Sequence, residues 1–204
     1  MSLINFLIQE GWLKTSQIIE AFQKIKRIDF LPENMQDLVE LNEALPIGWE
    51  QTISQPLVVA FMIELLEPKP GDKILDIGSG SGWTSALLAE IIGSKGKVFA
   101  IELVPELKEF GQKNVAKYNF IKKGIAKFIL ADGSKGYKEE APFDKILASA
   151  TAREIPQNWK DQLRVGGKIV CPVGSSIWLL TKESEKSFKK TEYPGFAFVP
   201  LIEK

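Results

Sequence analysis

The chain has 204 residues, of which 45% are hydrophobic and 25% are charged, and its 26 basic side chains balance its 26 acidic ones. This balance provides no general attraction to nucleic acid or anionic lipid, so neither is expected as a partner. The sequence contains no histidine and a single cysteine, Cys171. These counts exclude an internal disulfide, Ser–His and Cys–His nucleophile pairs and the commonest metal ligand, and no metal site is expected.

The ends and the length of the chain indicate one cytoplasmic domain. The first residues lack the basic region and the cleavage site of a signal peptide, and no apolar run is long enough to span a membrane. A single thiol suits a reducing compartment. We expect a monomer. Its length corresponds to a single α/β domain over 1–204, divided into an N-terminal helical cap with a substrate-side segment (1–56), a core (57–174) and C-terminal strands (175–204).

The first 50 residues predict a helical cap that packs on the core. One short helix presents Leu3, Phe6 and Leu7 on a single face. A second helix is expected after a cap at Thr15 or Ser16. Its apolar face comprises Ile18, Ile19, Phe22 and Ile25.

The segment from Gly48 to Pro56 is polar and leads into a third predicted helix. Proline suits the first turn of a helix, so we expect that helix to begin at Pro56. Thr52 and Ser54 therefore lie just ahead of a helix N-terminus. The residues alone leave two interpretations open, namely a cap formed by Ser54 or Gln55 and a functional site at Ser54.

Strands and helices alternate between residues 71 and 174. Strands are predicted near Ile74, Val98, Phe128, Ile146 and Ile169, and helices are predicted to start near Thr84, Pro105 and Pro156. Such alternation predicts an α/β fold, a doubly wound and mostly parallel Rossmann-like sheet with helices on both faces. We expect Gly166-Gly167 to form the turn into the fifth strand.

A glycine-rich stretch after the first core strand is the main functional signal. Gly78, Gly80 and Gly82 follow the apolar strand Lys73–Ile77, and Asp76 precedes them by two positions. A strand, a glycine loop and a helix N-terminus together form a nucleotide-type site. The spacing G-x-G-x-G differs from the dinucleotide fingerprint G-x-G-x-x-G and disfavours a nicotinamide dehydrogenase. The alternative interpretation is a glycine-rich turn without a ligand.

Acidic residues end the next two strands. Glu102 follows Gly82 by about 20 residues. At this separation along the sequence a carboxylate can accept hydrogen bonds from both hydroxyls of a ribose. Asp132, in Asp132-Gly133, can accept the exocyclic amino group of an adenine. The alternatives are a solvated strand end for Glu102 and a plain Asp-Gly turn for Asp132.

The last 30 residues predict an antiparallel C-terminal strand pair. The two expected strands cover 177–181 and 196–201, and the charged stretch 182–192 between them is expected to be a solvated loop.

Several stretches in order resemble the protein-L-isoaspartate O-methyltransferase family. They include Gln51-Thr-Ile-Ser-Gln-Pro56, Asp76-Ile-Gly-Ser-Gly-Ser-Gly82 and Asp132-Gly-Ser-Lys-Gly136, and the resemblance covers nearly the whole chain. The glycine motif alone indicates a methyltransferase, whereas the Gln-Thr-Ile-Ser-x-Pro segment is specific to this family. The resemblance implies S-adenosyl-L-methionine as the methyl donor and the free carboxylate of L-isoaspartyl residues in damaged proteins or peptides as the acceptor, which is a protein-repair reaction.

The resemblance also implies roles for individual residues. Ser54 is the implied catalytic residue, beside the transferred methyl group and the acceptor carboxylate. The implied substrate-binding residues are Gln55, Val199, Pro200 and Leu201. The implied cofactor-binding residues are Thr52, Ile53, Ser54, Gly78, Ser79, Gly80, Gly82, Glu102, Leu103, Asp132 and Gly133.

Departures from the family pattern fall on the expected substrate side. Leu57 stands where many members have histidine, and Trp49-Glu50 replaces smaller residues before Gln51. They motivate one alternative, a methyltransferase of the same fold with another small carboxylate or hydroxyl acceptor. A second alternative is a non-catalytic protein that binds S-adenosylmethionine. A carboxylate acceptor is already ionised at pH 7, so the reaction needs no general base and agrees with a chain without histidine.

Overall fold

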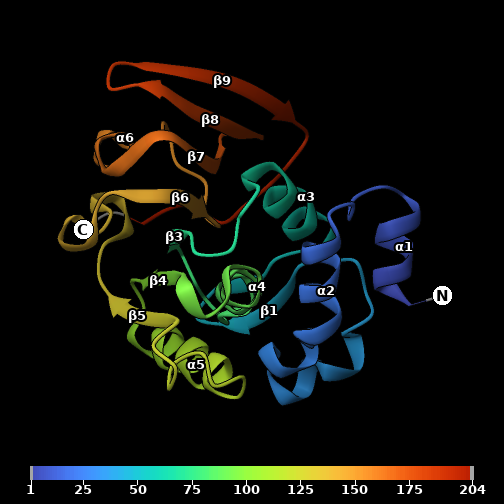
Figure 1. Ribbon diagram of the computed structural model, residues 1–204. Helices are drawn as coiled ribbons and strands as arrows, with labels where there is room; N and C mark the ends of the chain where they lie inside the picture. Colours follow the sequence, from blue (N-terminus) through green and yellow to red (C-terminus); the bar gives the residue numbers. More distant parts are fainter. Residues whose placement is uncertain (1, 203–204) are drawn as a thin grey trace.

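The computed structural model describes residues 2–202, and a seven-stranded sheet forms the centre of this part of the chain (Figure 1). The strand order is β5-β4-β3-β6-β7-β8-β9, parallel from β5 to β7 and antiparallel from β7 to β9. This mostly parallel sheet confirms the predicted fold class. The strands are β3 Lys73–Ile77, β4 Lys97–Glu102, β5 Ala126–Leu130, β6 Phe143–Ala148, β7 Leu163–Val173, β8 Ser176–Ser184 and β9 Ser187–Pro194.

The helices cover the two faces of the sheet unequally. Side chains alternate along β4, so that Val98 and Ala100 pack in the larger core with α2–α5, whereas Phe99 and Ile101 face the smaller core with α6 (Figure 1). The 3-10 turns Gly133–Lys135 and Lys138–Glu140 lie beside α6 on that second face. The helices are α1 Leu3–Gln9, α2 Ser16–Lys24, α3 Pro56–Leu66, α4 Trp83–Ile92, α5 Pro105–Ala116 and α6 Gln157–Gln162, with 3-10 turns at Arg27–Phe30, Glu33–Leu38 and Gly93–Lys95.

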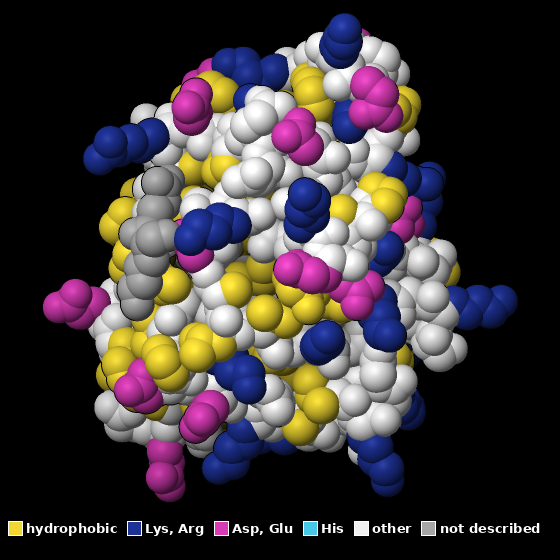
Figure 2. Space-filling model, turned by 90° about the vertical axis from the view of Figure 1, so that its left-hand side faces the viewer, with side chains coloured by type: hydrophobic (Ala, Val, Ile, Leu, Met, Phe, Trp, Pro, Cys, Tyr) yellow, Lys and Arg dark blue, Asp and Glu magenta, His cyan; other side chains and the backbone are white. Residues whose placement is uncertain are grey.

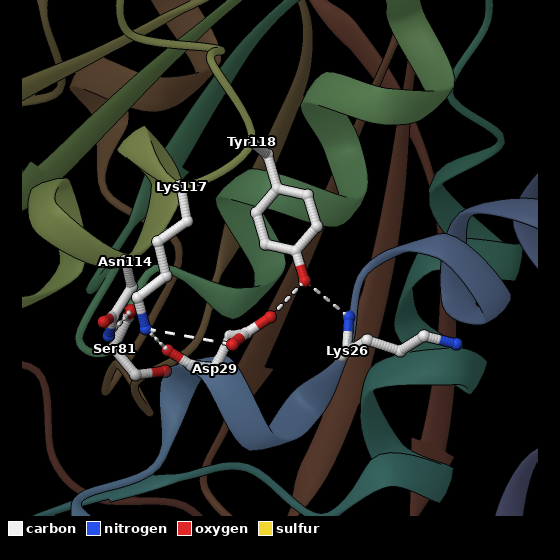
Figure 3. A network of polar contacts seen from close by, with 6 residues as sticks. All are labelled: Lys26, Asp29, Ser81, Asn114, Lys117 and Tyr118. Atoms are coloured by element: carbon white, nitrogen blue, oxygen red, sulfur yellow. Dashed lines mark hydrogen bonds and ion pairs between the residues drawn. The ribbon is translucent and has the colours of Figure 1, made fainter.

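A polar network fastens the N-terminal cap to the core (Figure 3). The Tyr118 hydroxyl, just after α5, donates to the Asp29 carboxylate at 2.6 Å and accepts from the Lys26 amide at 2.8 Å. Burial and the neighbouring Asp29 carboxylate raise the pKa of Tyr118 to about 12. In the same network Asn114 donates to the Ser81 carbonyl at 3.1 Å. Asn114 interrupts the apolar face of α5 because it contacts the glycine loop.

The C-terminal strand pair exists, but its second strand lies earlier than expected. The expected strand at 196–201 is wrong, because β8 pairs with β9, which ends at Pro194. The expected solvated loop at 182–192 is also wrong, since most of it belongs to these two strands. The Lys182 side chain is only 3% exposed, and its ammonium donates to the Leu163 carbonyl at 2.8 Å. A lysine-rich outer strand resembles a loop in sequence, since charged side chains commonly protect sheet edges.

Two local features near the site differ from the sequence prediction. A small hairpin of β1 Leu45–Gly48 and β2 Gln51–Ile53 precedes α3, and it was not predicted. Its tip residues Trp49 and Glu50 have φ values of 51° and 58°, positions at which hairpins usually carry asparagine or glycine. Gly166-Gly167 is part of β7 and not a turn before it. Within residues 2–202, no helix is both long and apolar enough to cross a lipid bilayer.

Candidate active site

A cavity of about 380 Å³ opens at the carboxyl ends of the central strands. Ile77, Ile101 and Ser149 line it, and these residues end or follow β3, β4 and β6. β3 lies between β4 and β6, so the chain first adds strands β4 and β5 on one side of β3 and then adds β6 and β7 on the other side. Ligands of open α/β sheets bind at such a switch point, so the cavity is the candidate active site.

The three glycines of the loop after β3 serve two different purposes. All three have positive φ values, 73° at Gly78, 49° at Gly80 and 85° at Gly82. Gly78 and Gly80 line the cavity, where the missing Cβ lets a ligand approach the backbone. Gly82 is not among the lining residues. A Cβ there would lie 2.7 Å from the Gly111 carbonyl oxygen, so Gly82 instead allows α4 and α5 to pack closely.

Asp76 lies beneath the glycine loop and anchors the start of α4. One oxygen of its carboxylate accepts from the Thr84 hydroxyl at 3.0 Å and from the Ser85 hydroxyl at 2.5 Å. The other oxygen has no hydrogen-bond partner among the described residues. Burial raises the pKa of Asp76 to about 6, although both hydroxyls act in the opposite direction. Asp76 therefore shapes the loop and is not part of the cavity wall.

Glu102 is a buried carboxylate in the cavity wall. Its Oε2 accepts from the Gly80 amide at 2.9 Å, and its Oε1 accepts from the Leu103 and Val104 amides at 2.8 and 3.1 Å. A carboxylate offers about four acceptor positions, so Glu102 can still accept from a ligand hydroxyl while it holds the glycine loop. The solvated-strand-end interpretation is wrong, because Glu102 is only 7% exposed.

The Asp132-Gly133 turn contributes its glycine to the cavity. Gly133 lines the cavity, and its carbonyl accepts from the Trp159 indole at 2.8 Å. The Asp132 carboxylate accepts from the amide and hydroxyl of Ser134 at 2.9 and 2.7 Å and pairs with Lys135 at 3.3 Å. Asp132 is not a lining residue, and its contact with an adenine stays a prediction.

Ser54 also lines the cavity, in what we call the acceptor wall together with Thr52, Ile53 and Gln55, and its hydroxyl makes no hydrogen bond within residues 2–202. The capping interpretation of Ser54 or Gln55 is wrong. The structure shows no side-chain cap from Gln55, and the Leu57 amide in the first turn of α3 instead donates to the side chain of Asn42 at 3.0 Å. Thr52, Ile53 and Gln55 line the cavity beside Ser54, and their contacts with cofactor or substrate stay predictions.

The C-terminal segment completes this wall. Val199, Pro200 and Leu201 all line the cavity. Thr151, which follows β6, accepts from the Leu201 amide at 2.9 Å and donates its own amide to the Val199 carbonyl at 2.8 Å. The segment predicted as a strand is thus an extended strip attached through Thr151.

Other lining residues were not predicted as site residues. The ends of β3, β4 and β6 could have been found by the strand-end rule, but the apolar residues of α3 and α5 carry no signal beyond burial. The Ser79 hydroxyl and the Trp83 indole are buried without partners within residues 2–202, which suits a polar ligand. The additional lining residues are Ala44, Gln51, Val58, Val59, Ile77, Ser81, Trp83, Thr84, Ile101, Val104, Leu107, Ser149, Ala150, Ala197, Phe198 and Ile202.

Comparisons with known proteins agree on one family. The family model described as protein-L-isoaspartate(D-aspartate) O-methyltransferase matches residues 1–204. The protein-L-isoaspartate O-methyltransferase of Methanopyrus kandleri is 40% identical over 98% of this chain and 89% of its own, and that of Pyrococcus horikoshii is 40% identical over 98% and 90%. A crystal structure of a Plasmodium falciparum relative with S-adenosyl-L-homocysteine covers 99% of this chain and 97% of its own, with a TM-score of 0.89 and 23% identity, and supports the fold.

Proposed function

The chain belongs to the protein-L-isoaspartate(D-aspartate) O-methyltransferase family, and on this premise we propose how its cavity performs that reaction. The enzyme transfers a methyl group from S-adenosylmethionine to the free carboxylate of L-isoaspartyl residues in damaged proteins or peptides. The observation that carries this proposal is the meeting of the glycine loop, Glu102 and the unbonded Ser54 hydroxyl in one cavity. We place the cofactor against the glycine loop and the acceptor against Ser54.

The cofactor side fits S-adenosylmethionine, which when bound supplies a methyl group on a positively charged sulfur. Gly78 and Gly80 let the backbone approach it, and the unpartnered Ser79 hydroxyl can donate to it. Glu102 would hold the ribose, and Leu103 and Gly133 would hold the adenine. Thr52 and Ile53 would also hold the cofactor. Gly82 acts through helix packing, and Asp132 acts by shaping the turn at Gly133.

The acceptor side needs to orient a carboxylate and not to activate it. The reference pKa of a carboxylate is near 4, so the acceptor is ionised at neutral pH. Ser54 donates a hydrogen bond to this carboxylate and aligns it, while the apolar walls exclude water. Gln55, Val199, Pro200 and Leu201 contact the polypeptide around the acceptor. Glu102 is the only ionisable side chain among the described lining residues, so neutral groups make these contacts.

The departure at Leu57 has little bearing on the acceptor wall. Leu57 is a partly buried side chain that packs against the larger core, and it is not a lining residue. Leu57 therefore gives no reason to expect a methyltransferase with another small carboxylate or hydroxyl acceptor. Trp49, which is 51% exposed at the hairpin tip, remains the feature that favours testing other acceptors.

Further proposals concern the setting of the enzyme. We propose a monomer that forms one domain over 1–204, acts in the cytoplasm and does not depend on nucleic acid. The balanced charge supports the last point, and the single buried thiol suits a reducing compartment.

The test measures methyl transfer from labelled S-adenosylmethionine to two matched peptides, one with isoaspartate and one with normal aspartate. Transfer to the isoaspartyl peptide alone is expected. Binding of S-adenosylhomocysteine in calorimetry without transfer to either peptide would refute the acceptor, and a panel of small carboxylates and hydroxyls would follow. No binding at all would refute the cofactor site.

Ser54→Ala tests the role of the hydroxyl. One lost hydrogen bond to a charged group should lower kcat for the isoaspartyl peptide about tenfold to a hundredfold. The dissociation constant of S-adenosylhomocysteine should change less than about twofold, because the cofactor side keeps its contacts. Equal losses in both quantities would show that Ser54 has only a structural role.

A further inference from the structure

The loop of residues 39–43, between the second 3-10 turn and β1, is held by one buried side chain. Arg27 is 7% exposed, and its guanidinium donates to the carbonyls of Val39 at 3.0 Å, Leu41 at 2.9 Å and Glu43 at 2.7 Å. Three such bonds from one planar group fix the path of the loop. Asn42 therefore has a defined position before it contacts any other part of the chain.

Asn42 contacts two residues that follow Ser54, at the start of α3. Its side-chain oxygen accepts from the Leu57 amide at 3.0 Å, and its carbonyl oxygen accepts from the Gln55 side-chain amide at 2.8 Å. The two bonds bind the residues that immediately follow Ser54 to a loop more than ten positions earlier in the chain. The residues next to Ser54 are thus held from outside their own segment.

The bond to Leu57 also decides what the Ser54 hydroxyl does. A serine just before a helix usually accepts from an amide of the first turn and caps the helix. Here Pro56 has no amide hydrogen, and Asn42 already accepts from the Leu57 amide. The hydroxyl of Ser54 remains at the cavity wall without a hydrogen bond inside residues 2–202. Asn42 thus supplies a side-chain acceptor to the first turn of α3, which its N-cap residue Gln55 does not.

We propose that Asn42 is a positioning residue for methyl transfer, which holds Ser54 in place and keeps its hydroxyl available to the acceptor carboxylate. This inference rests on the role proposed for Ser54. Arg27 holds the loop that carries Asn42. Its guanidinium also lies over the Trp83 ring, with 5.6 Å from the guanidinium carbon to the ring centre. Trp83 begins α4 directly after the glycine loop, so Arg27 contacts both the loop that carries Asn42 and the helix on the cofactor side.

The decisive experiment compares two substitutions at one position. In Asn42→Ala the Leu57 amide loses its acceptor, and kcat/KM for the isoaspartyl peptide should fall about tenfold. Asn42→Asp keeps a side-chain oxygen as the acceptor, and kcat/KM should return to within about threefold of wild type. The dissociation constant of S-adenosylhomocysteine should stay within about twofold in both. Asn5→Ala, an exposed asparagine on α1, is the matched control and should change nothing.

A double-mutant cycle then tests whether Asn42 acts through Ser54. In the Ser54→Ala background, Asn42→Ala should cause little further loss of kcat, because the hydroxyl that it positions is absent. Amide hydrogen exchange supplies a readout without turnover, since protection of the Leu57 amide should fall in Asn42→Ala and persist in Asn42→Asp. Independent losses in the two backgrounds, or no rescue by aspartate, would overturn the inference. Failure of the proposed function would appear separately, as wild-type enzyme that does not methylate the isoaspartyl peptide.

Discussion

The two walls of the cavity are built in different ways. On the cofactor wall many organising contacts are short in sequence, from Asp76 to Thr84 and from Glu102 to Leu103 and Val104, and one bond from Gly80 to Glu102 joins the ends of two neighbouring strands. On the acceptor wall the contacts join more distant segments, as in the bond from Leu57 to Asn42 and those between Thr151 and the C-terminal strip. A wall made largely from strand ends and a glycine loop can be recognised in a sequence. A wall assembled from separate segments depends on the fold to bring them together.

The largest expected effect tests how tightly the cofactor wall is packed. In Gly82→Ala the new Cβ would lie 2.7 Å from the Gly111 carbonyl oxygen at a φ of 85°, so the free energy of unfolding should fall by about 4 kcal/mol. Gly166→Ala is the control, because its φ is 80° but nothing lies within 4 Å of the new Cβ, and it should lose only about 1 kcal/mol. Denaturant unfolding measures both. Similar losses in the two variants would show that backbone conformation alone matters at Gly82.

The next effect is the pH dependence of the free energy of unfolding that arises from Asp76, beneath the glycine loop of the cofactor wall. Burial raises the pKa of Asp76 from near 3.8 to about 6, so its contribution to stability is full below about pH 4 and is lost as the pH rises through about 6. Asp76→Asn cannot titrate, and its unfolding free energy relative to wild type should therefore rise by about 2 kcal/mol between pH 4 and pH 7. Unfolding at several pH values measures this difference. The exposed Asp37→Asn serves as the control, and a difference that is constant with pH would contradict the prediction.

A smaller effect is expected where the N-terminal cap, which carries the loop with Asn42, meets the core. Tyr118→Phe removes the hydrogen bonds to Asp29 and to the Lys26 amide, and unfolding free energy should fall by about 1.5 kcal/mol (Figure 3). The KM for the peptide should rise more than the dissociation constant of S-adenosylhomocysteine. Tyr193→Phe is the control, since its hydroxyl makes no hydrogen bond within the described residues. An equal loss in the control would show that the network adds nothing.

The smallest effect is expected at the hairpin tip of the acceptor wall. Glu50 has a φ of 58°, which is costly for a residue with a Cβ, and Glu50→Gly should raise the free energy of unfolding by about 0.5 kcal/mol. Glu50→Ala keeps the Cβ and should bring no gain. Thermal unfolding compares the two variants. A gain in both would point to the charge of Glu50 and not to its backbone conformation.

One face of the molecule shows why composition alone says little about the acceptor. In the face shown in Figure 2, acidic and basic side chains are interspersed with several groups of hydrophobic ones, and neither charge dominates. A surface of this kind gives no long-range preference for a charged partner. The choice of acceptor must therefore come from short-range contacts in the cavity.

Sequence patterns predicted the core well where the signal was local. The strand Lys73–Ile77, the glycines after it and the helix that begins at Pro105 all occur as expected, because each depends on neighbours along the chain. The patterns failed at the end of β8, which holds the buried Lys182, and at β9, an exposed edge strand, because both looked like a solvated loop. The resemblance implied a cofactor contact for Gly82, whereas Gly82 packs against Gly111, because spacing does not reveal which glycine faces a ligand and which faces a helix.

The sequence by itself determined the reaction family, the sheet core and fewer than half of the described residues that line the cavity. Short motifs encode these features, since a positive φ, a strand end or a helix start is a property of a few neighbouring residues. Only the tertiary structure decided that Asn42, and not Ser54 or Gln55, satisfies the first turn of α3. It also decided that the C-terminal strip attaches through Thr151. These contacts join residues far apart in sequence, and no local pattern specifies which distant partner satisfies a given amide.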